Sequence, residues 1–317
     1  MIWGSVPPSP KEILEQRLRA EADRRDQPLE SVRDALVLRG LDAARSDREA
    51  HAVASDIVLV TATQTEHEQL EQAAKELGFS FEKIPRRYLD YYRLGLVGTN
   101  RVVAIRVSMG AFSPEGAAAR CIQARAETQA TTIILIGTAF GIAPEQQHIG
   151  DVIVSESVFL YDDRTVVDVD ETKMSQVAGK YEVRYAPSAR RSASRTWHDR
   201  FRRLGEQYIR DGVAEKVYVG VILSGGARIE SAAFRDELLA RLPSMDPPVV
   251  GGEMEGMGAV SAALATDPED PGWVIVKGIS DFADASSRSR IKDMRAGAAR
   301  ASAMAVLHVL QLPPRSE

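Results

Sequence analysis

The chain has 317 residues, a formal net charge of -5 at pH 7, and 44% hydrophobic and 27% charged residues. This composition is typical of a globular protein that is long enough to bury a full hydrophobic core. An acidic chain lacks the overall positive field that attracts a polyanion, so we expect no nucleic-acid polymer as a partner. No stretch approaches the ~18 apolar residues of a membrane span, and the single cysteine, Cys121, can form neither an internal disulfide nor a thiolate metal cluster. We therefore expect a cytoplasmic protein that spans no membrane and binds no metal.

The first 54 residues differ from the rest of the chain. Residues 10–51 are charged and helix-favouring, with few apolar positions, which predicts two surface helices. We expect a helical N-terminal extension over residues 1–54 and one larger domain over residues 55–317.

From Asp56 onward, short apolar runs alternate with segments of helical spacing. The apolar runs are continuous instead of alternating with polar residues, as in strands that are covered on both faces. This alternation of strands and helices predicts a three-layer α/β domain with a central sheet flanked by helices. The expected strands are residues 57–63, the two arms of a hairpin within 91–108, and residues 131–137, 150–161, 217–224 and 273–280; the expected helices are residues 66–78, 114–128, 234–242 and 296–311.

Positive charge is concentrated in residues 180–203. Charge runs are most often solvated faces, so the preferred interpretation is a solvated loop that leads into a helix. The alternative is an anion-binding rim near a pocket.

Polar residues follow four of the apolar runs: Glu66, the turn at residues 137–141, the Glu253-Met254-Glu255 triplet, and the Ser280-Asp281 pair. Ligands of open α/β sheets bind at the carboxyl ends of strands. A single carboxylate at such a place is more often a helix cap or a first-turn acid than a catalyst. Capping does not readily explain all four, so the pattern favours a ligand site.

Three segments resemble, in order, the motifs of the nucleoside phosphorylase and nucleosidase superfamily, in particular its methylthioadenosine/S-adenosylhomocysteine nucleosidase branch. They are GTAFGIAPEQQHIGDVIVS (137–155), GGEMEGMGA (251–259) and KGISDFAD (277–284). The resemblance covers residues 56–310 and implies a phosphorylase-like fold with a mixed central sheet. It also implies cleavage of a purine N-glycosidic bond without a metal or an organic cofactor, in a dimer or larger homo-oligomer.

The resemblance assigns roles to the last two motifs. Asp281, preceded by Ser280, matches the purine-contacting acid, and a protonated carboxyl there gives a proton to the departing base. Glu255 matches the glutamate that accepts hydrogen bonds from both ribose hydroxyls and favours positive charge at C1′. Met254 is either a ribose contact or a core methionine. Glu253 is either a second acid of the site or a buried partner.

The same resemblance places Glu66 where the nucleosidase branch has its water-activating glutamate. The branch usually has several consecutive acids there, whereas this chain has one at that point, so a shifted alignment makes Glu68 or His67 the base. Thr138 is expected to hold the attacking water, and Ala139 and Phe140 to line the base and ribose cavity.

Three further positions bear on the substrate. Ile229 matches a residue whose backbone meets the purine edge. Arg228 stands where the methylthioadenosine branch prefers an aromatic, and arginine can either stack on a base or bind a phosphate. Lys277 stands where an arginine is common.

The nucleophile is predicted to be water. The strand at 57–63 is followed by neither the glycine nor the arginine of a phosphate cradle, and the acid there repels phosphate. Residues 108–116 can still supply backbone amides for an anion, which keeps phosphorolysis open.

The resulting hypothesis is a purine nucleosidase that hydrolyses an adenine nucleoside or nucleotide. The alternatives are an AMP- or ATP-degrading effector in defence or stress, a purine nucleoside phosphorylase, and a non-catalytic nucleoside-binding protein. If the chain is an enzyme, Glu66, Glu255 and Asp281 should converge on one cavity.

Overall fold

The structure, a computed structural model, describes residues 53–168, 181–186, 190–211, 213–266, 271–284 and 287–313, together with Arg19. The chain divides into two units, Met1–Ala52 and Val53–Glu317. The predicted helices of the N-terminal extension lie outside the described residues apart from Arg19.

Among the described residues of the second unit, ten strands form one mixed sheet in the order β11-β10-β6-β12-β5-β1-β4-β3-β2, with β9 paired to β6. The neighbours β1, β5 and β12 are parallel. Because β11 also pairs antiparallel with the end of β5, the strands β5, β12, β6, β10 and β11 close into a ring. The strands of the sheet are β1 (Ile57–Thr61), β2 (Glu82–Ile84), β3 (Tyr91–Val97), β4 (Asn100–Arg106), β5 (Thr132–Gly141), β6 (Val152–Leu160), β9 (Arg190–Ser192), β10 (Val217–Ser224), β11 (Val249–Glu253) and β12 (Gly272–Asp281).

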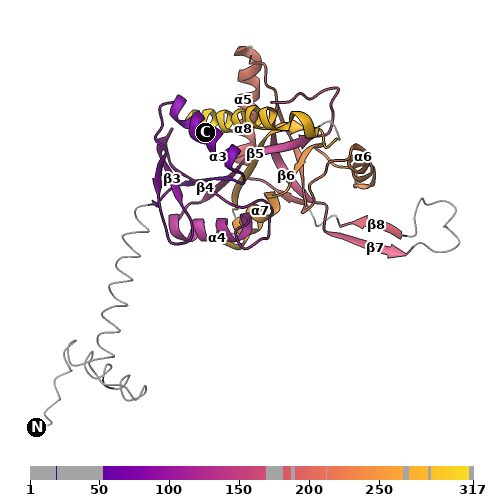
Figure 1. The fold of residues 1–317 in the computed structure, drawn as a ribbon, viewed down its shortest axis with the longest axis horizontal. Helices are drawn as coiled ribbons and strands as arrows, with labels where there is room; N and C mark the ends of the chain where they lie inside the picture. The colour runs from indigo at the N-terminus through magenta and orange to yellow at the C-terminus, as the bar shows by residue number, and fades with distance from the viewer. Residues whose placement is uncertain are drawn as a thin grey trace, which may run out of the picture. The chain divides into compact units, whose positions relative to one another are not determined.

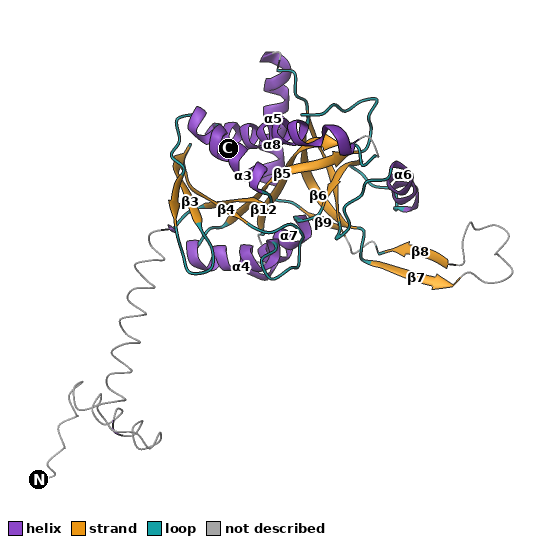
Figure 2. Ribbon diagram, in the orientation of Figure 1, coloured by secondary structure: helices purple, strands orange, loops and turns teal. Residues whose placement is uncertain are grey.

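Helices cover both faces of this sheet. Figures 1 and 2 show α3, α5 and α8 on one face and α4 and α7 on the other. A separate two-stranded sheet pairs β7 (Arg164–Asp168) with β8 (Tyr181–Tyr185). The helices are α3 (Gln64–Glu76), α4 (Ala117–Thr128), α5 (Arg195–Asp211), α6 (Ala232–Arg241), α7 (Gly256–Thr266) and α8 (Ser287–Gln311).

The side chains of the central strands alternate between two hydrophobic clusters. On β1, Val58 and Val60 face α4 and α7, whereas Ile57 and Leu59 face α3, α5 and α8. All four side chains are buried, which explains why the strand sequence shows no polar alternation. The predicted three-layer α/β fold with a mixed central sheet is therefore confirmed.

The closing helix is longer than its predicted range of residues 296–311. It begins at Ser287, about two turns earlier. The apolar and small-residue spacing marks only the part that packs on the sheet, and the preceding turns are polar. This difference matters because it brings Arg295 into the helix. No helix among the described residues is both long and apolar enough to cross a membrane.

Candidate active site

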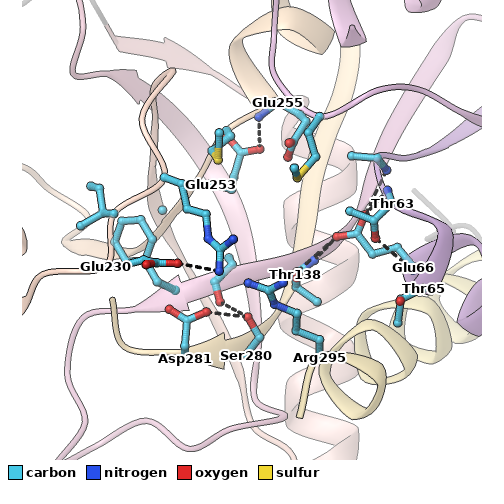
Figure 3. A pocket seen from close by; sticks show the side chains of 18 of the residues that line it. Thr63, Thr65, Glu66, Thr138, Glu230, Glu253, Glu255, Ser280, Asp281 and Arg295 are labelled. Carbon is cyan, nitrogen blue, oxygen red and sulfur yellow. Dashed lines mark hydrogen bonds and ion pairs between the residues drawn. The ribbon is translucent and has the colours of Figure 1, made fainter. Parts of the chain in front are cut away.

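A cavity of about 190 Å³ opens where β1, β5, β11 and β12 end (Figure 3). Since β5 lies between β1 and β12 in the sheet, residues that follow β1 and β12 approach the cavity from either side of β5. The structure brings together all eleven residues that the sequence singled out for a site. They are Glu66, Thr138, Ala139, Phe140, Arg228, Ile229, Glu253, Met254, Glu255, Ser280 and Asp281.

Glu66 is both a helix cap and a wall of the cavity. Its Oε2 accepts hydrogen bonds from the backbone N–H groups of Ala62 (3.0 Å) and Thr63 (2.9 Å), and Thr63 completes a capping box at the start of α3. Its Oε1 accepts from the backbone N–H of Thr138 (2.8 Å) and from the Thr138 hydroxyl (3.2 Å). The capping role that sequence patterns favour is therefore real, and the same bonds fix the carboxylate against β5.

Gly137 makes this contact possible. Its φ of +152° is unusual for other residues, and a Cβ at this position would run into the Glu66 carboxylate and approach the Lys277 ammonium. Glycine thus lets side chains from α3 and β12 meet above β5.

Lys277 lies beneath the cavity with no exposed surface. Its Nζ is 3.4 Å from Glu255 Oε2 and 4.0 Å from Glu253 Oε2. Burial disfavours the charged amine, but the carboxylates of Glu255, Glu66 and Glu253 outweigh burial and raise the pKa of Lys277. One buried cation therefore stands among three acids.

The two acids of the triplet have different surroundings. Glu253 Oε2 accepts from the N–H groups of Glu255 (2.9 Å) and Gly256 (2.8 Å), which ties it to the start of α7. Its Oε1 is buried without a hydrogen-bond partner among the described residues. Burial and the Glu255 carboxylate raise the pKa of Glu253 to about 7, against the opposing effect of Lys277. Glu255 Oε1 accepts from the Gly110 N–H (3.2 Å).

Asp281 ends β12, and both of its oxygens are held. Oδ1 accepts from the Ala283 N–H (2.9 Å), and Oδ2 accepts from the Ser280 hydroxyl (2.9 Å). The Ser280 hydroxyl also lies 3.3 Å from the Ala139 carbonyl on β5. The carboxyl is therefore oriented by Ser280 at the end of β12 and by the backbone that follows this strand.

The opposite wall comes from the loop after β10. Arg228 forms an ion pair with Glu230 (2.7 Å), and both side chains line the cavity. Ile229, which lies between these two residues in the sequence, is buried and packs with Phe140 in a third hydrophobic cluster. The positive charge of Arg228 is thus offset by a neighbouring carboxylate.

The structure places the alternatives to Glu66 outside the cavity. His67 packs edge-on against the rings of Phe81 and Tyr92, which stack on each other, and its Nδ1 lies 3.1 Å from the Thr61 hydroxyl. Burial lowers the pKa of His67 to about 4. Glu68 is exposed and accepts a hydrogen bond from Gln64. Among these three neighbours, Glu66 is the one that lines the site.

None of the described residues of the basic segment, residues 180–203, lines this cavity. The segment's described residues include Arg190, Arg195 and Arg202, which line a different cavity together with Glu156 and Asp199. Residues 195–203 begin α5, so the predicted helix is present. The predicted loop before it is wrong where the structure describes it, because β8 and β9 lie there and pair with β7 and β6.

Sequence reasoning missed several lining residues, and most of them carry no chemical motif. Met109 precedes α4, Glu230 follows the Arg228-Ile229 pair, and Arg295 belongs to the part of α8 that the sequence left out. The remaining lining residues are Ala62, Thr63, Thr65, Ala227 and Gly252. One signal for Arg295 was available in the sequence. Arg295 is spaced from Ala299 and Ser302 as residues on one face of a helix are, so it could have been assigned to the closing helix.

The fold has many relatives of known structure. Methylthioadenosine/S-adenosylhomocysteine nucleosidase of Neisseria meningitidis, solved with methylthio-immucillin-A, superposes with a TM-score of 0.61 at 20% identity. The superposition covers 80% of this chain and 98% of the nucleosidase chain. Futalosine hydrolase of Helicobacter pylori superposes with a TM-score of 0.60 at 17% identity, and the superposition covers 82% of this chain and 98% of the hydrolase chain. At these identities the likeness is one of fold.

Sequence comparison gives the family. A death domain-containing ATP nucleosidase of Amphimedon queenslandica is 29% identical over 188 residues, which are 56% of this chain and 33% of the relative. The chain thus spans about a third of that relative's length. The sequence profile described as the phosphorylase superfamily matches residues 56–311, which include every strand of the large sheet. The chain belongs to the phosphorylase superfamily.

Proposed function

We propose that the protein is a purine nucleosidase that hydrolyses the N-glycosidic bond of an adenine nucleoside or nucleotide. The observation that carries this proposal is the convergence of Glu66, Glu255 and Asp281 on one cavity, with Glu66 and Asp281 approaching from either side of β5. Figure 3 shows Glu66 and Asp281 on opposite sides of the cavity, and Glu255 on a third side. A carboxylate pair that flanks the scissile bond suits glycoside hydrolysis.

Each carboxyl group has a proposed step. Glu66 takes a proton from water, and the water oxygen forms a bond to C1′ of the sugar. The C1′–N9 bond breaks, its electrons go to the purine, and Asp281 gives a proton to the ring nitrogen N7. Glu255 accepts hydrogen bonds from the two ribose hydroxyls and stabilises the positive charge that grows at C1′. The products are free base and a ribose derivative, and solvent returns the protons to their starting groups.

Thr138 is the proposed partner of the attacking water. Four donors fill the accepting sites of the Glu66 carboxylate. The bond from the Thr138 hydroxyl is the longest of the four, and a hydroxyl can rotate. Its rotation frees one Glu66 lone pair for the water and lets Thr138 hold the same water.

Two observations favour water over phosphate. Carboxylates outnumber cations in the cavity lining, which opposes a free phosphate beside Glu66. Within the loop that precedes α4, Gly110 donates its N–H to Glu255, and Met109 is the loop residue that reaches the cavity. The candidate amide cradle is therefore in part already engaged.

The test is an assay of base release from adenosine, inosine, methylthioadenosine, S-adenosylhomocysteine, AMP and ATP, with and without phosphate. The proposal expects adenine from at least one adenine substrate at a rate that phosphate does not change. A requirement for phosphate together with ribose 1-phosphate as product would indicate a phosphorylase. Binding of adenosine or AMP with no release of base would indicate a nucleoside-binding protein.

A nucleotide-degrading effector is the second candidate. The relative named as an ATP nucleosidase favours it, because that name joins this fold family to a phosphorylated substrate. The same assay separates it from the first candidate by the preference for ATP over methylthioadenosine. A cytoplasmic location and a homo-oligomeric state remain predictions.

A further inference from the structure

We propose that Arg295 of α8 binds the 5′-phosphate of the substrate and makes the enzyme selective for 5′-phosphorylated adenine nucleosides. This inference rests on the proposed nucleosidase function. Its basis is the distribution of positive charge around the cavity and the packing of α8 on the sheet.

The cations that the sequence suggested for a phosphate are engaged elsewhere. Lys277 is fully buried among carboxylates, and Arg228 is paired with Glu230. Arg190, Arg195 and Arg202 of the basic segment line another cavity. These groups therefore leave little positive charge for a phosphorylated ligand.

Arg295 differs from them. It lines the cavity, is half-buried, and makes no ion pair or hydrogen bond with the other described residues. In Figure 3 its side chain points from α8 into the cavity. A guanidinium that is not neutralised by a carboxylate is available for a bidentate phosphate contact.

Close packing of α8 fixes this position. The Ser302 hydroxyl donates to the Gly137 carbonyl on β5 (2.9 Å), and the backbone of Ala298 lies so close to β12 that a Cβ at Gly278 would run into it. The chain of α8 thus descends from the carboxyl ends of β5 and β12 toward their middles. Arg295 lies one turn before Ala298 and Ala299, at the level of Thr138 and Ser280.

The neighbours of Arg295 indicate which part of a nucleotide it meets. In the proposed binding mode, Asp281 contacts the base and Glu255 holds the ribose hydroxyls. Helix α8 packs on α3, whose first turn contributes Thr65 and Glu66 to the cavity. Of the lining residues to which this binding mode gives no contact with the base or the ribose, we assign Thr63, Thr65, Met109 and Arg295 to the 5′ substituent.

The chemistry of these four residues favours a phosphate over a thioether. Two threonines and an arginine provide polar groups, and Met109 alone provides a large apolar side chain. A 5′-alkylthio group gains its binding energy from apolar contacts. A 5′-phosphate gains it from charge-assisted hydrogen bonds. Because carboxylates dominate the rest of the lining, an anion is tolerated only where an unpaired cation faces it.

The test compares kcat/KM for adenine release from adenosine, methylthioadenosine, AMP, ADP and ATP in the full-length chain. The variants are R295M, which removes the charge and keeps a long side chain, and R295K, which keeps the charge and loses the bidentate geometry. R300M is the matched control, because Arg300 lies on the same helix, pairs with Glu76 of α3 and does not line the cavity.

We expect the unmodified protein to prefer a nucleotide over adenosine and methylthioadenosine. R295M should lower kcat/KM for that nucleotide by about 10- to 100-fold, the range for a hydrogen bond to a charged group, and should change adenosine hydrolysis far less. R295K should fall between the two, and R300M should match the unmodified protein. The number of phosphates that the site accepts follows from the order of AMP, ADP and ATP.

Three results would overturn the inference. One is equal kcat/KM of the unmodified protein for adenosine and the nucleotides. Another is an equal loss in R295M for adenosine and the nucleotides, which would make Arg295 a general structural or catalytic group. The third is a full nucleotide preference in R295M. If R295M does not fold, as judged by circular dichroism, R295K carries the test, and an undiminished nucleotide preference there counts against the bidentate contact. Absence of adenine release from every substrate contradicts the nucleosidase function itself and is distinct from these outcomes.

Discussion

Lys277 is a buried cation that contacts two glutamates of the cavity lining, Glu255 and Glu253. Removing an ion from water is costly unless opposite charges and hydrogen bonds replace the solvent. Here Glu255 and Glu253 lie within 4.0 Å of the ammonium, and Glu66 also raises its pKa. Burial of the lysine therefore depends on the acids, and burial of the acids depends on the lysine.

K277M should destabilise the protein by about 3–5 kcal/mol, because it leaves buried carboxylates without their cation. Urea unfolding at pH 7 measures this loss. K75M is the matched control: Lys75 forms an exposed pair with Glu71, and its removal should cost at most about 1 kcal/mol. Equal losses in the two variants would show that the buried cluster is not held by its charge balance.

Glu253 predicts a pH dependence of stability. Its pKa is raised from 4.5 to about 7 in the folded protein, so the folded state holds a proton that the unfolded state releases. The stability gained from this proton is complete below pH 4.5 and is lost as the pH rises through about 7. Lys277 does not contribute in this range, because its raised pKa lies at alkaline pH.

E253Q removes this titration. Between pH 5 and pH 8 the unmodified protein should lose on the order of 1–3 kcal/mol more stability than E253Q. Thermal unfolding at both pH values measures the difference. The titration of His67 also contributes to the pH dependence, but its contribution cancels because both proteins contain this residue. Identical pH profiles would mean that Glu253 is ionised throughout this range.

At the scale of elements, the contact between α8 and β12 determines where Arg295 lies. Gly278 permits this contact, because a side chain there would meet the Ala298 backbone. On the same helix, Gly297 is exposed and has open space around the position of a Cβ. The two glycines form a matched pair, one required by packing and the other not.

G278A should destabilise the protein by about 1–3 kcal/mol, since α8 must move away from the sheet to relieve the clash. It should also lower adenine release, because Arg295 moves with the helix. G297A should instead stabilise the protein by about 0.5–1 kcal/mol, because alanine is the better helix former. Chemical unfolding of both variants decides the matter, and a neutral G278A would contradict the close contact.

The limits of sequence reasoning are also visible among the elements. Strand β1 and helix α3 were predictable, because an unbroken apolar run and a polar helical segment ending near Gly78 are local signals. The polar start of α8 was not, since a helix turn without an apolar stripe has no such signal. The pairing of β11 with β5 is a contact between distant segments that no local pattern encodes.

At the scale of the molecule, the site depends on a convergence that three ordered motifs made predictable. Each predicted residue ends or follows a strand, and parallel strands bring their carboxyl ends together. What the sequence could not provide is the charge balance. The engagement of Arg228 by Glu230, the burial of Lys277 and the position of Arg295 all depend on side-chain contacts across elements.

The role of Asp281 as the acid of the proposed hydrolysis is tested most directly by measuring adenine release by the unmodified protein and by D281N, together with binding of the same substrate by calorimetry. Asparagine keeps the shape of Asp281 but cannot give a proton to the departing base, so kcat should fall by about 10²- to 10⁴-fold while binding is largely retained. D163N, at an exposed aspartate in a turn outside the cavity, should behave as the unmodified protein. Unchanged turnover in D281N would contradict the proposed acid and the account of the site built on it.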